Sequence, residues 1–182
     1  MSALVRSAPA RLQRAAAHVL FGSRRWSERS VRDLAATCHD QRILEIGSGR
    51  QDHGDDAYSV RAMFDGSNDF VQSDMNPSFG HPVVDVTSMD FEDEFDLIIC
   101  LYVLEHVFDI SAAVQNMHRA LRPGGRVVIA VPHVYPYHDE PIDFWRLTEH
   151  SLRMLLAAHS DVEIRHAGLR RMPKALLAIA RK

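Results

Sequence analysis

Residues 43–49 read Ile43-Leu44-Glu45-Ile46-Gly47-Ser48-Gly49, a short apolar run that ends in two closely spaced glycines. Branched apolar residues are typical of a strand in a parallel sheet that is buried on both faces. The glycines permit a tight turn and allow a ligand to approach the backbone closely. Open α/β sheets bind nucleotide-like molecules at such strand-to-helix turns. The stretch therefore predicts an α/β fold with a ligand site beside the glycine turn.

Apolar and helical segments alternate outward from this stretch. We expect strands over 42–46, 69–73, 82–86, 95–101, 126–131, 161–169 and 175–180, and helices over 27–38 (N-cap Ser27), 56–65, 111–121 and after the capping Thr148. Only four residues link the last two strands, so these should pair antiparallel. The pattern predicts a three-layer α/β/α sandwich with a Rossmann-like, seven-stranded, mostly parallel sheet and one antiparallel strand. Residues 74–81 are short for a parallel crossover, so either this crossover lacks a helix or one strand is misplaced.

The length of 182 residues fits one catalytic domain over residues 41–182, preceded by N-terminal helices over residues 1–40. The first of these helices is expected over about 9–20, and the pair should form a lid over the site. No stretch approaches the roughly 20 apolar residues of a membrane span. The two cysteines, Cys38 and Cys100, look like core positions and indicate a reducing, cytoplasmic location.

Charge is distributed unevenly along the chain. The net charge is +4 over residues 1–40, −12 over residues 41–110 and +5 over residues 111–182. An acidic central region argues against a nucleic-acid partner, because affinity for nucleic acids comes mainly from basic residues. It suits a cationic or polyhydroxyl ligand. The sequence gives no indication of the oligomeric state.

Several spaced motifs resemble the class I S-adenosylmethionine-dependent methyltransferases over about residues 28–182, and in particular a type-11-like bacterial subgroup that acts on small molecules. Glu45-Ile46-Gly47-Ser48-Gly49 is similar to the first motif of that family, Leu121-Arg122-Pro123-Gly124-Gly125 to its lead into the fifth strand, and residues 178–182 to its last strand. The resemblance implies S-adenosylmethionine as cofactor. The cofactor-binding positions that it implies are Glu45, Gly47 and Gly49 for the methionine end, Asp74 for the ribose, Met75 next to it, Asp85 and Val86 for adenine, and Leu101 beside the reaction centre. A carboxylate inside an apolar run needs a partner, so Glu45 should bind either the ammonium of the cofactor or N–H groups of the loop.

The main rival ligand is a dinucleotide, which also binds after the first strand. Its G-x-G-x-x-G fingerprint would need glycine where this chain has Asp52, and a carboxylate there would repel a pyrophosphate. The sulfonium cofactor has no phosphate, so an acidic residue is tolerated. Gln51 also departs from the methyltransferase pattern, because many members have a third glycine at that position.

Methyl transfer to a hydroxyl is helped by a base that removes its proton. The candidates are His106, His133 and His138, with Asp139 and Asp143 as bases or as groups that orient a histidine. The segment from His133 to Arg146 follows the fifth strand, at the edge where such sheets bind ligands. We expect it to line the acceptor pocket with Tyr135, Asp143, Trp145 and Arg146. The alternative is a packed loop anchored by Trp145, with Arg146 paired to Asp143 or Asp139.

These patterns predict transfer of a methyl group from S-adenosylmethionine to a small molecule. The preferred acceptor atom is an oxygen, in a hydroxyl of a sugar, lipid or natural product, and a nitrogen comes second. The alternatives left open are a catalytically inactive S-adenosylmethionine-binding protein and an NAD-dependent oxidoreductase. A metal site formed by His133, His138 and Asp139 is conceivable. Since members of the family with this layout mostly need no metal, we expect none.

Overall fold

The computed structural model describes residues 22–51, 58–138 and 141–182. Within these residues the chain forms a six-stranded sheet in the order β2-β1-β3-β4-β6-β5. The strands are β1 (Arg42–Ile46), β2 (Asp69–Ser73), β3 (Phe95–Leu101), β4 (Leu121–Pro132), β5 (Ser160–Leu169) and β6 (Met172–Arg181). The helices are α2 (Arg24–Ala35), α3 (Ile110–Ala120) and α4 (Glu149–Leu155), with short 3₁₀ helices η1 (Arg61–Met63), η2 (Pro77–Phe79) and η3 (Leu104–His106).

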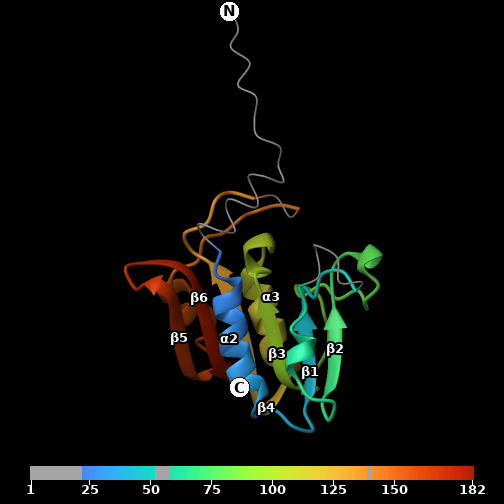
Figure 1. Ribbon diagram of the computed structural model, residues 1–182. Coiled ribbons are helices and arrows are strands. Elements are labelled where there is room, and N and C mark those ends of the chain that lie inside the picture. Colours follow the sequence, from blue (N-terminus) through green and yellow to red (C-terminus); the bar gives the residue numbers. More distant parts are fainter. Residues whose placement is uncertain (1–21, 52–57, 139–140) are drawn as a thin grey trace, which may run out of the picture.

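The sheet is buried on both faces because alternate residues of its central strands enter two different cores. Leu44 and Ile98 belong to one hydrophobic cluster, which α3 and α4 cover. Ile43 and Leu97 point the opposite way into a second cluster, to which α2 contributes Val31. Figure 1 shows α2 crossing the face of the sheet, between the two ends of the strand order. The expected three-layer α/β/α sandwich is confirmed.

Strand directions follow the expected pattern. β1 runs parallel to β2 and β3, and β3 runs parallel to β4. β6 is antiparallel to both of its neighbours, β4 and β5. The prediction of one reversed strand in a terminal hairpin is therefore confirmed, and β6 is the reversed strand.

The prediction of a seventh strand over 82–86 is wrong. This region makes only one isolated parallel bridge, between Asp74 and Val83. Pro82 has no N–H to donate to a neighbouring strand. Asp85 then turns the chain, because its carbonyl accepts from the N–H groups of Ser88 and Met89. Residues 74–81 therefore lead from β2 into a connecting segment and not into a parallel strand, so no crossover is needed there.

Two predicted helices also differ from the structure. α2 begins after Ser23 and not after Ser27, which lies inside the helix and donates from its Oγ to the carbonyl of Arg24. In the described part of 56–65, only the 3₁₀ turn η1 forms. The reason is local, since Ser59 and Val60 turn toward Glu45 and bind its carboxylate. The helix predicted over 9–20 lies outside the described residues.

The helix starts near the site are defined by side-chain caps. Asp109 accepts from the N–H of Ala112 at the start of α3. Thr148 and Ser151 form a reciprocal capping box at the start of α4, as expected from the sequence. α3 ends at Ala120, and Leu121 continues directly into β4. These caps fix where α3 and α4 begin. Both helices contribute to the hydrophobic cluster that contains Leu44 and Ile98.

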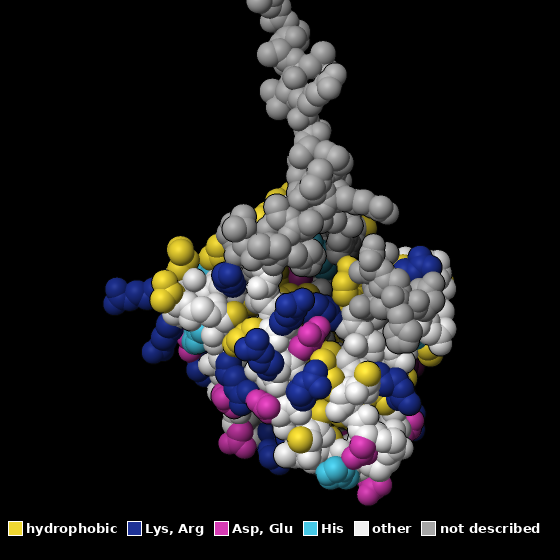
Figure 2. Space-filling model, in the orientation of Figure 1, with side chains coloured by type: hydrophobic (Ala, Val, Ile, Leu, Met, Phe, Trp, Pro, Cys, Tyr) yellow, Lys and Arg dark blue, Asp and Glu magenta, His cyan; other side chains and the backbone are white. Residues whose placement is uncertain are grey.

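The exposed face of α2 is basic. Arg25, Arg29 and Arg32 are exposed along this helix, and Figure 2 shows dark blue side chains gathered in this part of the surface. None of the described helices is long and apolar enough to cross a bilayer.

Candidate active site

A pocket lies at the carboxyl ends of β1, β3 and β4. The chain leaves β1 toward β2 on one side, and β3 pairs on the other side. This is the switch point at which open α/β sheets bind ligands. The pocket is lined by residues from the start of α2, from the loop after β1 and from the segments after β3 and β4: Gly22, Ser23, Arg24, Gly47, Tyr58, Leu101, Tyr102, Glu105, His106, Pro132, Tyr135 and His138.

Gly47 lines the pocket, and its position has no room for a side chain. Its φ is +76°, and an added Cβ would lie 2.4 Å from Cγ2 of Val103. Its N–H donates to the carbonyl of Ser73, 3.0 Å away, which ties the glycine turn to the end of β2. The backbone of Gly47 is therefore fixed in position and borders the pocket without a covering side chain. Gly49 also has a positive φ, of +70°.

Glu45 supports the glycine loop from below. Its side chain is buried, and Oε2 accepts from the hydroxyls of Ser48 and Ser59 at 2.8 Å and 2.5 Å. Oε1 accepts from the N–H of Val60 at 2.7 Å. Burial raises the pKa of the Glu45 carboxyl, and these hydrogen bonds only partly oppose that shift. The sequence analysis had allowed either loop N–H groups or the cofactor as its partner, and the structure shows an N–H and two hydroxyls.

Asp74 connects the end of β2 to the glycine loop. Its Oδ2 accepts from the N–H of Gly49 at 3.0 Å, and Oδ1 accepts from the N–H of Asn76 at 2.9 Å. Because a carboxylate oxygen can accept more than one hydrogen bond, both oxygens can also accept from a diol. The next residue, Met75, is 62% exposed.

Asp85 and Val86, the expected adenine contacts, are held by local structure. Oδ1 of Asp85 accepts from the N–H and the hydroxyl of Thr87 at 2.8 Å and 2.7 Å, and these bonds lower the pKa of the Asp85 carboxyl. Val86 is buried, and its carbonyl accepts from Nδ2 of Asn116 at 3.0 Å. Their contact with adenine stays a prediction.

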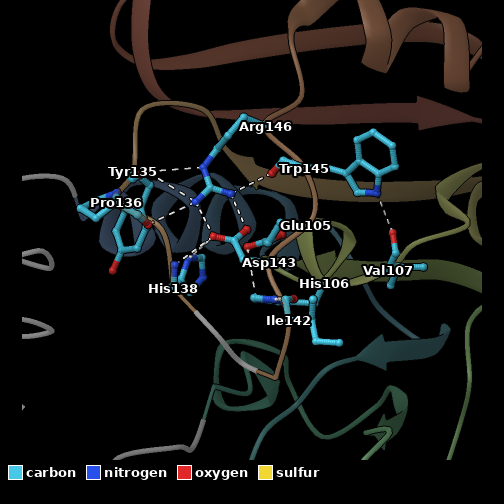
Figure 3. A network of polar contacts seen from close by, with 10 residues as sticks. All are labelled: Glu105, His106, Val107, Tyr135, Pro136, His138, Ile142, Asp143, Trp145 and Arg146. Atoms are coloured by element: carbon cyan, nitrogen blue, oxygen red, sulfur yellow. Dashed lines mark hydrogen bonds and ion pairs between the residues drawn. The ribbon is translucent and has the colours of Figure 1, made fainter. Parts of the chain in front are cut away.

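An ion pair organises the segment that follows β4. The side chain of Asp143 is 1% exposed, and Arg146 binds both of its oxygens, at 2.5 Å and 2.6 Å (Figure 3). Burial alone would raise the pKa of this carboxyl. Hydrogen bonds from Arg146 and from the N–H of His138 outweigh burial and lower the pKa to about 2.

Arg146 and Trp145 brace the segment from behind the pocket. Arg146 donates to the carbonyls of Tyr135, Pro136 and Trp145 as well as to Asp143. Nε1 of Trp145 donates to the carbonyl of Val107 at 3.0 Å. These are the contacts expected of a packed loop, with Arg146 paired to Asp143. Direct contact of Asp143, Trp145 and Arg146 with an acceptor stays a prediction, whereas Tyr135 lines the pocket itself.

The structure brings two of the three candidate histidines together. The rings of His106 and His138 stack edge to face with centroids 5.0 Å apart, and both line the pocket. Nδ1 of His106 lies 2.8 Å from the carbonyl of Ile142, and Nδ1 of His138 lies 3.0 Å from Oδ2 of Asp143. His133 instead directs Nδ1 to the carbonyl of Leu147 and is absent from the pocket lining. Asp139 lies outside the described residues.

Other pocket residues had no assigned role in the sequence analysis. Glu105 is 2% exposed, and Tyr102 has a φ of +58° with its hydroxyl 2.8 Å from Oγ of Ser23. The guanidinium of Arg24 lies 4.7 Å from the ring centroid of Tyr58. A carboxylate inside the apolar run 101–107 was a usable signal for Glu105, as it was for Glu45. No local pattern marked Arg24 or Tyr58.

Comparison with known proteins identifies a family for most of this chain. The model of the family described as "Methyltransferase domain" matches residues 20–167. This range includes the glycine loop, the two pocket histidines and the segment after β4.

Curated relatives match shorter parts of the chain. It is 37% identical over 68 residues to the uncharacterized protein YafE of Escherichia coli strain K12, covering 36% of this chain and 31% of that protein. It is 42% identical over 38 residues to the ubiquinone biosynthesis O-methyltransferase of Pseudomonas syringae pv. tomato, covering 21% of this chain and 16% of that protein. The matches thus span less than a third of these relatives.

Solved structures share the fold over nearly the whole chain. The CurJ carbon methyltransferase superimposes with a TM-score of 0.68 at 16% identity, covering 91% of this chain and 57% of that one. The Burkholderia thailandensis 1,6-didemethyltoxoflavin-N1-methyltransferase, solved with its substrate and S-adenosylhomocysteine, gives a TM-score of 0.61 at 19% identity, covering 100% and 93%. At these identities the likeness establishes the fold alone. The expected Rossmann-like methyltransferase fold is therefore confirmed, with six strands in the described residues in place of seven.

Proposed function

The chain belongs to the methyltransferase domain family, and we propose that it transfers a methyl group from S-adenosylmethionine to a hydroxyl oxygen of a small molecule. The predicted enzyme class and its cofactor are confirmed at the level of the family. The acceptor and the site residues are the proposal. They rest on the geometry of the pocket.

The residues of the glycine loop fit this cofactor. Gly47 presents a backbone without a Cβ at the pocket wall, and Asp74 presents two carboxylate oxygens beside Gly49. A carboxylate matches a ribose diol well, because charged hydrogen bonds are stronger than neutral ones. The cofactor supplies an already activated methyl group on its sulfonium. The protein then has to bind it, align the acceptor oxygen and exclude water.

One observation carries the choice of an oxygen acceptor: a single pocket joins Gly47 to His106 and His138. Because Nδ1 of His106 donates to a carbonyl, the neutral ring carries its lone pair on Nε2. A nitrogen lone pair held in that way can take the proton of a hydroxyl. In this proposal His106 and His138 face the acceptor and serve as its base. His133 has a structural role, because its Nδ1 lies 2.9 Å from the carbonyl of Leu147.

A small acceptor is favoured by the acidic centre of the chain, with its net charge of −12 over residues 41–110. The same charge disfavours nucleic acid as the acceptor. The Burkholderia neighbour is an enzyme whose titled substrate is a small molecule, and the Pseudomonas relative is titled an O-methyltransferase. We extend both features to this chain. We also propose a cytoplasmic location, where the cofactor is made and where Cys38 and Cys100 stay reduced.

A thermal-shift comparison tests the cofactor directly. S-adenosylmethionine should raise the Tm of the full chain, and NAD should leave it unchanged, since a ligand stabilises the state that binds it. A shift with NAD alone would support the oxidoreductase alternative and overturn the proposal.

The transfer itself is tested with methyl-labelled cofactor and a panel of small molecules that carry hydroxyl groups. Label should pass to an oxygen of at least one of them, and His106→Gln should lower kcat more than it changes the affinity for cofactor. Cofactor binding without transfer to any acceptor would support the inactive binding protein. Transfer to nitrogen only would overturn the choice of oxygen.

A further inference from the structure

We propose that Glu105, His106 and His138 form a binding site for one divalent transition-metal ion in the wall of the pocket. One ligand atom from each of the three side chains lies within 4.8 Å of the other two. The sequence analysis expected no metal and considered a different set, His133, His138 and Asp139. In the structure Nδ1 of His133 lies 2.9 Å from the carbonyl of Leu147, and Glu105 and His106 lie beside His138.

The three donors come from two segments that are far apart in sequence. Glu105 and His106 lie on η3, directly after β3, and His138 lies in the segment after β4. Oε1 of Glu105 is 3.9 Å from Nε2 of His106. Two ligands that are each about 2.1 Å from a tetrahedral ion lie about 3.4 Å apart. The Glu105–His106 pair is thus about 0.5 Å wider than the spacing that an ion requires, and the widest pair, at up to 4.8 Å, would have to close by about 1.4 Å on binding.

The surroundings orient both rings as metal sites usually do. The carbonyl of Ile142 accepts from Nδ1 of His106, and the opposite ring nitrogen, Nε2, lies on the side of Glu105. Oδ2 of Asp143 accepts from the backbone N–H of His138 at 3.0 Å and lies 3.0 Å from Nδ1 of its ring, so this carboxylate fixes the position of His138 beside the other two donors. Arg146 binds both oxygens of Asp143 and keeps that carboxylate in place. Figure 3 shows Asp143 between His138 and Glu105, with Arg146 beyond it.

The backbone locks the two segments together. The carbonyl of Glu105 accepts from the N–H of Phe144 at 2.8 Å and from that of Trp145 at 3.3 Å. The donors therefore belong to one braced unit. A loop with Asp143, Arg146 and Trp145 engaged in this way gives the ring of His138 a defined position, which a metal site requires.

The donor types indicate the kind of ion and its role. Two imidazoles and one carboxylate suit Zn²⁺, Mn²⁺, Fe²⁺ or Co²⁺ better than Mg²⁺ or Ca²⁺, which prefer oxygen ligands only. The described residues supply three ligands, and an ion held by three protein ligands has positions open for substrate, as in catalytic sites. Since the group faces the same pocket as Gly47, the open positions face the acceptor.

The inference rests on the proposed function for the identity of the acceptor, and it narrows the class: a hydroxyl with a second oxygen on the adjacent carbon, able to chelate the ion. With an ion bound, Nε2 of His106 would be a ligand and not the base, and the ion would replace it in activating the hydroxyl. Coordination would lower the pKa of the hydroxyl, which would release its proton to water. The acceptor oxygen then forms a bond to the methyl carbon. The carbon–sulfur bond breaks and leaves its electron pair on sulfur, giving the methyl ether and S-adenosylhomocysteine.

The test measures metal binding by the full chain, without a histidine tag and stripped of metal by a chelator. Titration with Co²⁺ should give visible absorption bands typical of histidine and carboxylate coordination, saturating at one ion per chain. Zn²⁺ should abolish these bands by competition. His106→Gln and His138→Gln should each weaken Co²⁺ binding at least about 100-fold, and Asp143→Asn about 10- to 100-fold, as expected for a group that orients a ligand.

His150→Ala is the matched control, because His150 is an exposed histidine on α4 outside the group. It should leave the Co²⁺ titration unchanged. Each variant is compared at equal circular dichroism and Tm, and any variant that fails to fold is replaced by Glu105→Gln. Co²⁺ binding that is absent, or equally strong in all the variants, overturns the metal site.

The two proposals fail separately. A chain that binds S-adenosylmethionine and transfers methyl groups after chelation, but binds no Co²⁺, retains the proposed function without the metal. A chain that binds Co²⁺ through His106 and His138 but not S-adenosylmethionine retains the metal site and loses the proposed function. Transfer that stops on chelation and returns with Zn²⁺ or Mn²⁺, for acceptors with two adjacent oxygens only, supports both.

Discussion

Two buried carboxylates organise the two sides of the pocket, and they do so in opposite ways. Glu45, under the glycine loop, is bound by two hydroxyls and one backbone N–H, and burial raises its pKa. Asp143, behind the histidines, is bound by a guanidinium, and its pKa falls to about 2. The difference shows what each side can provide. The loop side has a shape set by neutral donors, whereas the histidine side has a buried ion pair that holds His138 in position.

The largest effect on stability is expected from removing Arg146, the cation that pairs with Asp143. Arg146→Ala leaves the carboxylate of Asp143 buried without its main partner, so the free energy of unfolding should fall by about 3 kcal/mol. Urea unfolding measures this change. The control is Arg153→Ala on α4, which removes an exposed ion pair with Glu149 and should cost less than about 1 kcal/mol. Equal losses in the two variants would show that Asp143 and Arg146 have no special weight.

A smaller loss is expected when the shape of the loop side is changed. In Gly47→Ala the new Cβ meets Val103 and the φ of +76° becomes strained, so we expect a loss of about 2 kcal/mol and weaker cofactor binding. Gly124→Ala is the matched control, because its φ is +81° but nothing lies within 4 Å of the added Cβ. It should cost about 1 kcal/mol, from backbone strain alone. If both variants bind S-adenosylmethionine equally well, Gly47 does not shape the site.

The smallest effect, and the most direct test of the contrast in pKa, comes from Glu45→Gln. The folded pKa of Glu45 is raised above the reference value of 4.5, so its contribution to stability is present below pH 4.5 and is lost as the pH rises through the folded pKa. Glutamine does not ionise, so the variant loses no stability in this way as the pH rises. The variant should therefore gain stability relative to the natural protein between pH 4 and pH 7, from a starting deficit of about 1 kcal/mol.

Urea unfolding at a series of pH values measures this trend. A difference between Glu45→Gln and the natural protein that stays constant with pH would contradict the raised pKa of Glu45. If the natural protein instead became more stable relative to the variant as the pH rises, the pKa of Glu45 would be lowered and not raised.

Much of the fold could be predicted because its signals are local. The apolar run before Gly47, the capping Thr148 and the short link between β5 and β6 each specify structure within a few residues. The strand predicted over 82–86 failed because an apolar pair next to Pro82 does not say whether a neighbouring strand is within reach. The helix start was placed at Ser27 because both Ser23 and Ser27 satisfy the same capping preference.

The site was predicted less completely because its contacts are distant in sequence. The sequence marked Glu45 as a carboxylate in need of a partner, but the partners Ser59 and Val60 lie 14 and 15 residues later. His106 and His138 were chosen from their motifs, and only folding brings their rings to 5.0 Å. For Asp143 the sequence left several roles open, and the structure shows two of them, a position beside His138 and an ion pair with Arg146. Local patterns marked candidate residues, and long-range packing decided which of them meet.

Calorimetric titration of the full chain with S-adenosylhomocysteine tests the central claim, that the loop after β1 and the end of β2 bind the cofactor. The account predicts one site per chain, weakened at least tenfold by Asp74→Ala, which removes the carboxylate beside Gly49. Asp69→Ala, at the opposite end of the same strand, should leave the affinity unchanged. No binding by the natural protein, or equal binding by the two variants, would contradict the account.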